Sequence, residues 1–201
     1  MTYGMEVAVE SDSLDTRPEQ DVLWLKQIAE GNRSAFEKLY GDYQKRLYRY
    51  FFRTAGTVEV AEELTNDVLV EVWKKAGEFK GLSKVSTWIF GIAHHKLMNQ
   101  FRTKRPKTVE IESAAHVPDA NATPEESAAQ ENLKSKIKRA LGGLSPEHRE
   151  VMELTFTDGL SYQEIAEIMQ CPVNTVKTRM FYAKKQMQEI LAGMGIRRES
   201  A

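Results

Sequence analysis

Large apolar side chains recur every three or four residues through most of this 201-residue chain, and no stretch alternates in the way of a β-strand or hairpin. The spacing is clearest between residues 36 and 51, where Phe36, Leu39, Tyr43 and Leu47 fall on one face of a helix. A chain patterned in this way has to bury helical stripes against one another. We therefore predict an all-α fold.

Capping signals predict the helix boundaries. A Ser, Thr or Asp side chain at the start of a helix accepts a hydrogen bond from a free backbone N–H, and Gly commonly follows the last turn. Four helices are predicted in the first half of the chain. The first runs from Asp21 to near Gly31, and the second begins at a capping box of Ser34 and Glu37. The third covers residues 61–76, and the fourth runs from Ser86 or Thr87 to about Arg102. Four more are predicted in the second half. One runs from Thr123 and Pro124 to Gly142 and Gly143, and the next from Ser145 and Pro146 to before Gly159. A third begins at a capping box of Ser161 and Glu164, and the last follows Pro172.

Residues 106–132 divide the chain. This stretch holds three of the six prolines, few large apolar residues, and one basic against six acidic residues. It cannot bury much surface, so we predict a flexible acidic linker. Residues 21–105 carry a net charge of +5 and residues 133–201 carry +3, so each part could bind a polyanion. The predicted organisation is an acidic tail (1–20), a helical domain (21–105), the linker (106–132), a helix-turn-helix domain (133–192) and a tail (193–201).

The composition excludes several classes of protein. A single cysteine, Cys171, excludes an intramolecular disulfide framework and a Cys-rich zinc site, and it favours a reducing compartment. No run of about 18 apolar residues is present to span a membrane, and the acidic start has no signal-peptide pattern. We expect a cytoplasmic monomer without membrane insertion. Cys171 is expected to be a small buried thiol, with a redox switch as the alternative.

The sharpest local motif is a helix-turn-helix between Leu160 and Met187. One stripe of its second helix should face the core: Val173, Val176, Met180, Ala183, Met187, Ile190 and Leu191. The opposite face mixes cations, hydrogen-bond donors and aromatic rings, which can reach phosphates, base edges and thymine methyls in a major groove. A helical hairpin that meets another protein is the alternative. This face carries Asn174, Lys177, Thr178, Phe181, Tyr182 and Lys185.

The helix predicted before the linker carries a second polar stripe of stacking and basic groups, as nucleic-acid sites do. An ordinary solvated face is the alternative. His94 and His95 could suggest a metal, but neighbours on a helix point about 100° apart, and no metal or other cofactor is predicted. The stripe comprises Trp88, Ile92, His95, Lys96, Asn99, Arg102 and Thr103, whereas Ile89, Ala93, Leu97 and Phe101 are expected in the core.

An acidic row lies on the helix predicted over 61–76. Glu63, Asp67 and Glu71 follow one another at intervals of four, beside Val70, which we expect to be exposed. Like charges at this spacing repel one another. The row therefore indicates a basic partner surface, with a solvated face as the alternative.

Taken in order, three segments resemble bacterial sigma factors of the extracytoplasmic-function (ECF) type: AEELTNDVLVEVWKKAGEFKG, STWIFGIAHHKLMNQFR and, after the linker, LSPEHREVMELTFTDGLSYQEIAEIMQCPVNTVKTRM. Response-regulator output domains share the last pattern, but a receiver domain would need alternating strands and helices. The resemblance implies a protein that binds core RNA polymerase at the β′ clamp coiled coil and the β subunit, recognises promoter DNA and helps to open it. It implies no catalysis by the chain itself, and it implies control by an anti-sigma factor.

Carried over to this sequence, the resemblance assigns three surfaces. The core polymerase surface comprises Glu63, Asp67, Val70 and Glu71. The −10 surface, which needs a pocket and stacking groups because extruding a base is costly, comprises Phe79, Lys80, Ser83, Lys84, Ser86, Trp88, His95, Asn99 and Arg102. The −35 surface comprises Asn174, Thr175, Lys177, Thr178, Arg179, Phe181, Tyr182 and Lys185, with Arg179 and Lys185 better placed for phosphates or packing.

The sequence also departs from the family pattern. His94 and His95 stand where many relatives have Arg-Asn, and Asn99 stands where they have an acid, so the −10 preference should differ. Asn174 stands where relatives often have Gly, and Thr178 stands where they usually have Ser, so the −35 preference should differ as well. We further expect the acidic tail and linker to fold over the basic faces and reduce DNA binding at low salt. A stand-alone helix-turn-helix regulator is the main alternative, and a helical metalloenzyme built on His94 and His95 is another.

Overall fold

The computed structural model describes residues 17–103, 133 and 135–196. Every regular element within them is helical, so the all-α prediction is confirmed. The predicted linker and the residues before 17 and after 196 lie outside the described part. The elements are α1 (Arg17–Ala29), α2 (Arg33–Ala55), α3 (Val58–Lys75), the short 3-10 helix η1 (Ala76–Glu78), α4 (Val85–Thr103), α6 (Pro146–Phe156), α7 (Tyr162–Ile168) and α8 (Val173–Gly193); residues 135–142 are also helical.

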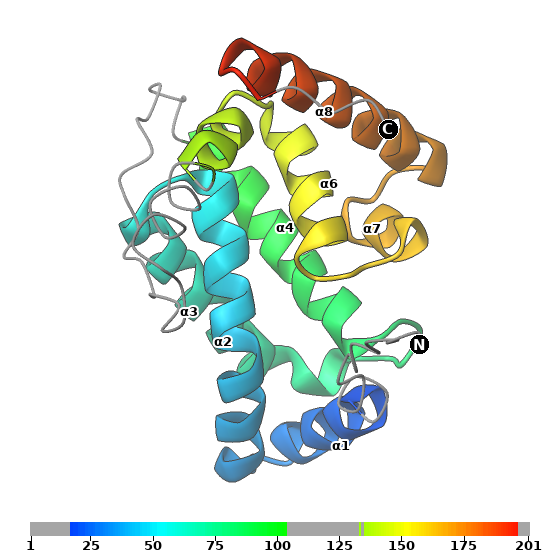
Figure 1. The fold of residues 1–201 in the computed structure, drawn as a ribbon. Helices are drawn as coiled ribbons and strands as arrows, with labels where there is room; N and C mark the ends of the chain where they lie inside the picture. The colour runs from blue at the N-terminus through cyan, green and yellow to red at the C-terminus, as the bar shows by residue number, and fades with distance from the viewer. Residues whose placement is uncertain (1–16, 104–132, 134, 197–201) are drawn as a thin grey trace, which may run out of the picture.

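Helices α1 to α4 form an N-terminal unit around α2. α2 contacts α1, α3 and α4, and it runs along the length of the molecule (Figure 1). Its stripe of Leu39, Tyr43, Leu47 and Phe51 is fully buried, as the three-to-four-residue spacing predicts. α2 ends at Gly56, whose φ of 89° places it in the left-handed region that a helix-ending glycine adopts most easily.

Residues 135–196 form a C-terminal unit in which α6, α7 and α8 contact one another. Ser145 caps α6, and the predicted capping box of Ser161 and Glu164 begins α7. Val176, Met180 and Ala183 of α8 are buried, as the predicted core stripe requires. The predicted inner face of α8 therefore packs into the interior of the molecule.

The two units also pack against one another. α6 lies against α2, and α7 lies against α4 (Figure 1). A single cluster of buried apolar side chains runs through both units, from Tyr50 and Phe90 on one side to Val151, Leu154 and Ile165 on the other. This close packing is not visible in the sequence, which predicts two units separated by a linker.

Several predicted helix starts are wrong. α2 begins at Arg33 because the side chain of Asn32 accepts a hydrogen bond from the backbone N–H of Ala35, and Asn is as good a cap as Ser34. α1 begins before Asp21, whose carboxylate instead accepts a hydrogen bond from the hydroxyl of Tyr43 on α2. α3 begins three residues earlier than predicted and α4 one residue earlier.

Candidate polymerase and promoter-DNA interfaces

The exposed face of α8 gathers the residues predicted for the −35 surface. Phe181 is 64% and Tyr182 52% exposed, and their rings meet edge to face with centroids 5.4 Å apart. Exposed aromatic rings of this size are unusual on a helix that meets only water, so they point to a partner. Asn174, Lys177, Thr178 and Lys185 are exposed beside them, whereas Thr175 and Arg179 are half-buried.

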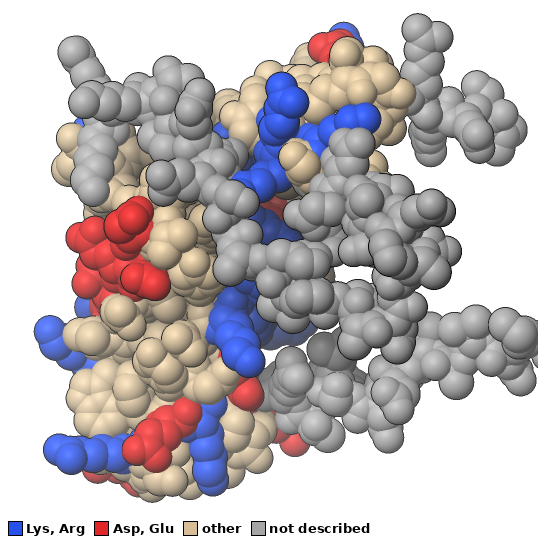
Figure 2. Space-filling view, turned by 60° about the vertical axis from the view of Figure 1, so that its left-hand side comes forward, with Lys and Arg blue, Asp and Glu red and all other residues tan. Residues whose placement is uncertain are grey.

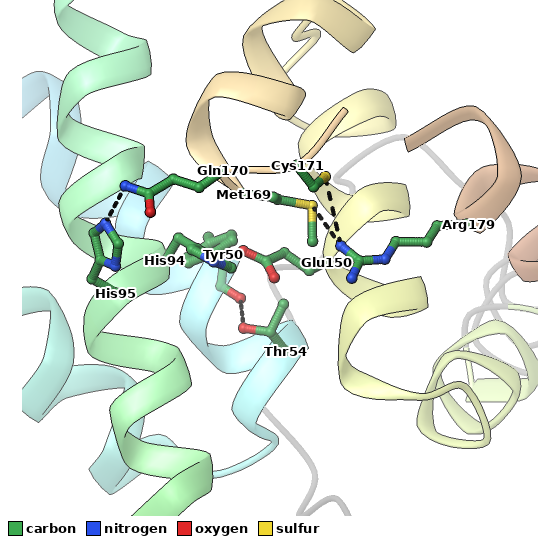
Figure 3. Close-up of polar contacts among 9 residues, drawn as sticks. All are labelled: Tyr50, Thr54, His94, His95, Glu150, Met169, Gln170, Cys171 and Arg179. Atoms are coloured by element: carbon green, nitrogen blue, oxygen red, sulfur yellow. Dashed lines mark hydrogen bonds and ion pairs between the residues drawn. The ribbon is translucent and has the colours of Figure 1, made fainter. Parts of the chain in front are cut away.

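Arg179 faces the turn of the helix-turn-helix motif. Its guanidinium lies 3.9 Å from Sγ of Cys171 and 4.0 Å from Sδ of Met169 (Figure 3). The arginine therefore contacts the turn that follows α7. This contact favours the predicted packing role of Arg179 rather than a direct contact with a base. Cys171 is half-buried, so the expectation of a buried thiol is wrong.

The residues predicted for the −10 surface lie on the loop after η1 and on one side of α4. The rings of Phe79 and Trp88 pack 5.5 Å apart, which holds the loop against the helix. Leu82, in the same loop, is 88% exposed and borders an open depression together with Val22 of α1. The sequence analysis did not single out Leu82. A signal was present, because an apolar residue between Gly, Ser and Lys in a loop belongs to no helical stripe that could bury it. Of the other residues predicted for the −10 surface, Lys80 and Lys84 in the loop and His95, Asn99 and Arg102 along α4 are exposed, whereas Ser83, Ser86 and Trp88 are half-buried.

Two of these −10 residues contact the C-terminal unit. Nζ of Lys84 lies 2.9 Å from the carboxylate of Glu164 on α7. Nε2 of His95 lies 3.0 Å from Nε2 of Gln170, which follows α7 (Figure 3). In this arrangement Glu164 and Gln170 therefore contact part of the predicted −10 surface, while Lys84 and His95 stay exposed.

The acidic row predicted for core polymerase lies on the outer face of α3. Glu63, Asp67 and Val70 are exposed, Val70 by 50%, and Figure 2 shows acidic side chains gathered over this part of the molecule. Glu71 is less accessible, because its carboxylate lies 2.8 Å from both Lys75 and Lys96. Burial raises the pKa of Glu71, but the hydrogen bonds and charges of these two lysines outweigh it and hold the pKa below its usual value.

Lys96 was assigned by sequence reasoning to the polar stripe of α4. Its Nζ instead reaches α3, 2.8 Å from Glu71 and 3.7 Å from Asp67. The lysine thus neutralises part of the acidic row. Only the packing of α4 on α3 brings these residues together, so spacing along one helix could not reveal the pairing.

A buried polar cluster lies where α2, α4 and α6 meet (Figure 3). Oε1 of Glu150, a fully buried residue, accepts a hydrogen bond of 2.6 Å from the hydroxyl of Tyr50 and lies 2.7 Å from Nδ1 of His94. Burial and the neighbouring carboxylate raise the pKa of Tyr50 well above its usual value, so it stays protonated and donates. His94 is therefore a partner of Glu150, and the described residues contain no group of three or more potential metal ligands.

Two family models match this chain in order: sigma-70 region 2 over residues 39–106 and sigma-70 region 4 over residues 134–187. Region 2 spans the α3 and α4 surfaces, and region 4 spans the helix-turn-helix motif. The chain is a sigma-70 family member of the ECF type. The region 2 match overturns the alternative of a stand-alone regulator, which would need only the C-terminal motif.

Known sigma factors are similar to this one over most of their length. RNA polymerase sigma-H factor of Pseudomonas aeruginosa is 26% identical over 86% of this chain and 94% of the relative. ECF RNA polymerase sigma factor SigW of Bacillus subtilis is 26% identical over 83% of this chain and 94% of the relative. The solved structure of the sigma factor RpoE in complex with the anti-sigma factor NepR, from Bartonella quintana, is 26% identical and superposes with a TM-score of 0.62, covering 78% of this chain and 96% of that one.

None of the described helices is long and apolar enough to cross a membrane.

Proposed function

We propose that this sigma factor binds core RNA polymerase, directs it to promoters and helps to open them, while the polymerase does the chemistry. The observation that carries the proposal is the ordered match to regions 2 and 4, with an exposed surface of suitable chemistry in each. Such a protein acts in the cytoplasm, without a cofactor and as a single copy per polymerase. A stress or envelope response is the process that its ECF type suggests.

The core polymerase contact is proposed at α3. Glu63, Asp67 and Glu71 present carboxylates beside the exposed apolar Val70, and this combination suits a basic coiled-coil surface such as the β′ clamp. Apolar contact supplies affinity, and the carboxylates supply orientation and association rate. The β subunit is the second polymerase contact implied by the family.

The promoter contacts are proposed at both ends of the molecule. The depression beside Leu82, in the loop between the packed rings of Phe79 and Trp88, offers a place for an unstacked base of the −10 element. The exposed face of α8, with Phe181 and Tyr182 among its cations, fits the major groove of the −35 element. The domains proposed for these roles span residues 21–105 and 133–192.

Control by an anti-sigma factor is proposed from the family. The Bartonella relative was solved with such a partner, and the chain aligns with 96% of that sigma factor. Copurification from cells under several stresses should yield a small stoichiometric partner. Its absence under every condition would contradict this part of the proposal.

The central experiment adds the purified protein to core RNA polymerase that lacks any sigma factor, with genomic DNA of the source organism as template. We expect a stable complex and transcripts with discrete starts, whose upstream sequences share two spaced elements. Sequence-specific DNA binding without association with polymerase would refute the sigma assignment.

A further inference from the structure

A histidine at the contact between the two units faces a fully buried carboxylate. Nδ1 of His94 on α4 lies 2.7 Å from Oε1 of Glu150 on α6, and the two side chains are 11% and 0% exposed (Figure 3). The hydroxyl of Tyr50 on α2 donates to the same oxygen at 2.6 Å. Oε2 of Glu150 is buried and has no hydrogen-bond partner among the described residues. Of the two side chains that meet this carboxylate, only His94 can carry a positive charge.

The charges buried at this contact balance only when His94 is protonated. Two other carboxylates of the C-terminal unit each meet an arginine of α2: Asp158 with Arg46 at 3.2 Å, and Glu153 with Arg53 at 3.1 Å. No arginine or lysine of the described residues lies within ion-pair distance of Glu150. An arginine keeps its charge at every pH, whereas a histidine is the side chain that changes its charge between about pH 5 and about pH 8. Loss of the histidine proton therefore leaves one buried negative charge without a counter-charge.

The other groups near His94 do not supply the missing charge. The ring centroid of His95 lies 5.7 Å from that of His94, but His95 is exposed to solvent. Three further pairs occupy the other elements that pack on α4: Lys84 with Glu164 of α7, Lys96 with Glu71 of α3, and Asp21 of α1 with the hydroxyl of Tyr43. The proton on His94 therefore decides the charge balance at Glu150.

The two carboxylates that meet arginines respond to pH in the same direction. Burial raises the pKa of Glu153 and that of Asp158, and Arg53 and Arg46 offset only part of this rise. A group whose pKa is raised by folding contributes stability at low pH, and that contribution is lost as the pH rises through the raised value. Protonation of His94 strengthens its pair with Glu150 in the same sense. All of these groups make the contact more stable at lower pH.

We propose that the pair of His94 and Glu150 makes the packing of the two units sensitive to pH near neutrality. With a proton on His94, the pair is neutral as a whole and holds α4 against α6. Without that proton, Glu150 remains as a desolvated charge, and its return to water favours separation of the units. The ratio of separated to packed molecules should rise by at most about tenfold for each pH unit over which this single proton is lost. The inference concerns the contact itself and does not depend on the proposed function.

The test follows the contact as both pH and urea are varied. Dyes that are insensitive to pH are placed on Gln44→Cys of α2 and Gln188→Cys of α8, both exposed, in a Cys171→Ser background. Energy transfer between them is measured as urea is added at several values between about pH 5 and about pH 8. Circular dichroism in the same titrations separates loss of the contact from unfolding of the helices. In the parent protein, the urea concentration at which energy transfer is lost should fall as the pH rises.

Two variants remove the titrating group in opposite ways. His94→Arg keeps the positive charge, so its contact should match that of the parent protein at about pH 5 and be stronger at about pH 8. His94→Gln keeps a hydrogen-bond donor without the charge, so its contact should be weaker than that of the parent at about pH 5 and similar at about pH 8. Glu150→Gln removes the charge that needs a partner and should also reduce the pH dependence, which gives a second route should the larger side chain of His94→Arg not pack. His95→Gln, at the exposed neighbouring position, is the matched control and should follow the parent protein.

The proposal is overturned if the parent protein and His94→Gln lose energy transfer with the same dependence on pH, because the pair would then contribute no titrating charge. It is also overturned if His95→Gln loses as much of the pH dependence as His94→Gln, or if the contact of the parent protein strengthens as the pH rises. A smaller pH dependence shared by every variant is expected, because Glu153 and Asp158 titrate as well. Core polymerase is absent from these measurements, so a failure of the proposed function leaves their outcome intact.

Discussion

Replacing Lys96 with Met should tighten the binding of core polymerase. The Lys96 ammonium lies 2.8 Å from Glu71 and 3.7 Å from Asp67, and both carboxylates belong to the proposed polymerase surface. Its charge therefore offsets the negative potential that a basic partner needs. Methionine keeps the aliphatic packing of the side chain and removes only the charge.

The size of the effect follows from the exposure of the pairs. The side chains of Lys96, Asp67 and Glu71 are 22%, 58% and 28% exposed, so solvent screens much of the attraction between them. Pairs of this kind contribute about 0 to 1 kcal/mol. If the partner recovers all of that, affinity rises by up to about fivefold, and the free protein loses a similar amount of stability. Lys75, 2.8 Å from Glu71, remains to keep that carboxylate ionised at neutral pH.

The assay titrates fluorescently labelled sigma factor into core polymerase at low and at raised salt. The gain should shrink as salt screens the exposed charges, and Lys26→Met, at an exposed position on α1, should show no gain. If Lys96 were instead a promoter contact, as its place in the polar stripe of α4 suggests, the variant would leave core affinity unchanged and weaken only promoter binding. That result, or weaker binding to core polymerase, would refute the reasoning.

Three further predictions test other parts of the structure. Ser161→Ala removes the hydroxyl that accepts from the N–H of Glu164, and should cost about 1 kcal/mol in thermal unfolding; an unchanged melting temperature would contradict the capping box. Burial raises the pKa of Glu153 above 4.5 despite its basic partner, so the stability that this carboxyl contributes is present in full at low pH and is lost as the pH rises through the raised value. Wild type should therefore lose stability relative to Glu153→Gln in urea unfolding as the pH rises above the ordinary value of 4.5, whereas a constant difference would exclude this role. Phe181→Ala and Tyr182→Ala should each weaken −35 contacts by about tenfold in footprints of the holoenzyme while binding to core polymerase stays unchanged, and an intact upstream footprint would count against the proposed α8 surface.

Local features of this fold could be predicted from sequence, and features that depend on packing could not. The capping box of Ser161 and the cap at Ser145 lie within four residues of the groups that they satisfy, so spacing alone identifies them. The start of α2 was predicted wrongly because Asn32 and Ser34 are both adequate caps, and it is Asn32 that forms the hydrogen bond. The contact of His94 with Glu150 could not be predicted, because helical periodicity records which side a residue faces and not which helix will cover that side.

The same distinction applies to the candidate sites. The −35 face needs only one helix, and the structure leaves all six residues predicted from its spacing exposed. The −10 and core polymerase surfaces involve several elements, and there the structure adds partners that spacing cannot supply. Lys96 joins α4 to α3, and Glu164 joins α7 to the loop before α4.

Those added partners connect the proposed surfaces to one another. A basic polymerase surface that takes Glu71 competes with Lys96, and so acts on the helix that carries the −10 residues. The −10 residue Lys84, in turn, can engage DNA phosphates only by leaving Glu164 of the C-terminal unit. Each step exchanges an internal ion pair for an external one and leaves one internal charge, Lys96 or Glu164, without that partner, so the external contact has to offset the loss. Contacts at the α3 row and at Lys84 are therefore each coupled to an internal ion pair that they displace, and the apolar groups at each interface, such as Val70 and Leu82, have to supply the rest of the binding free energy.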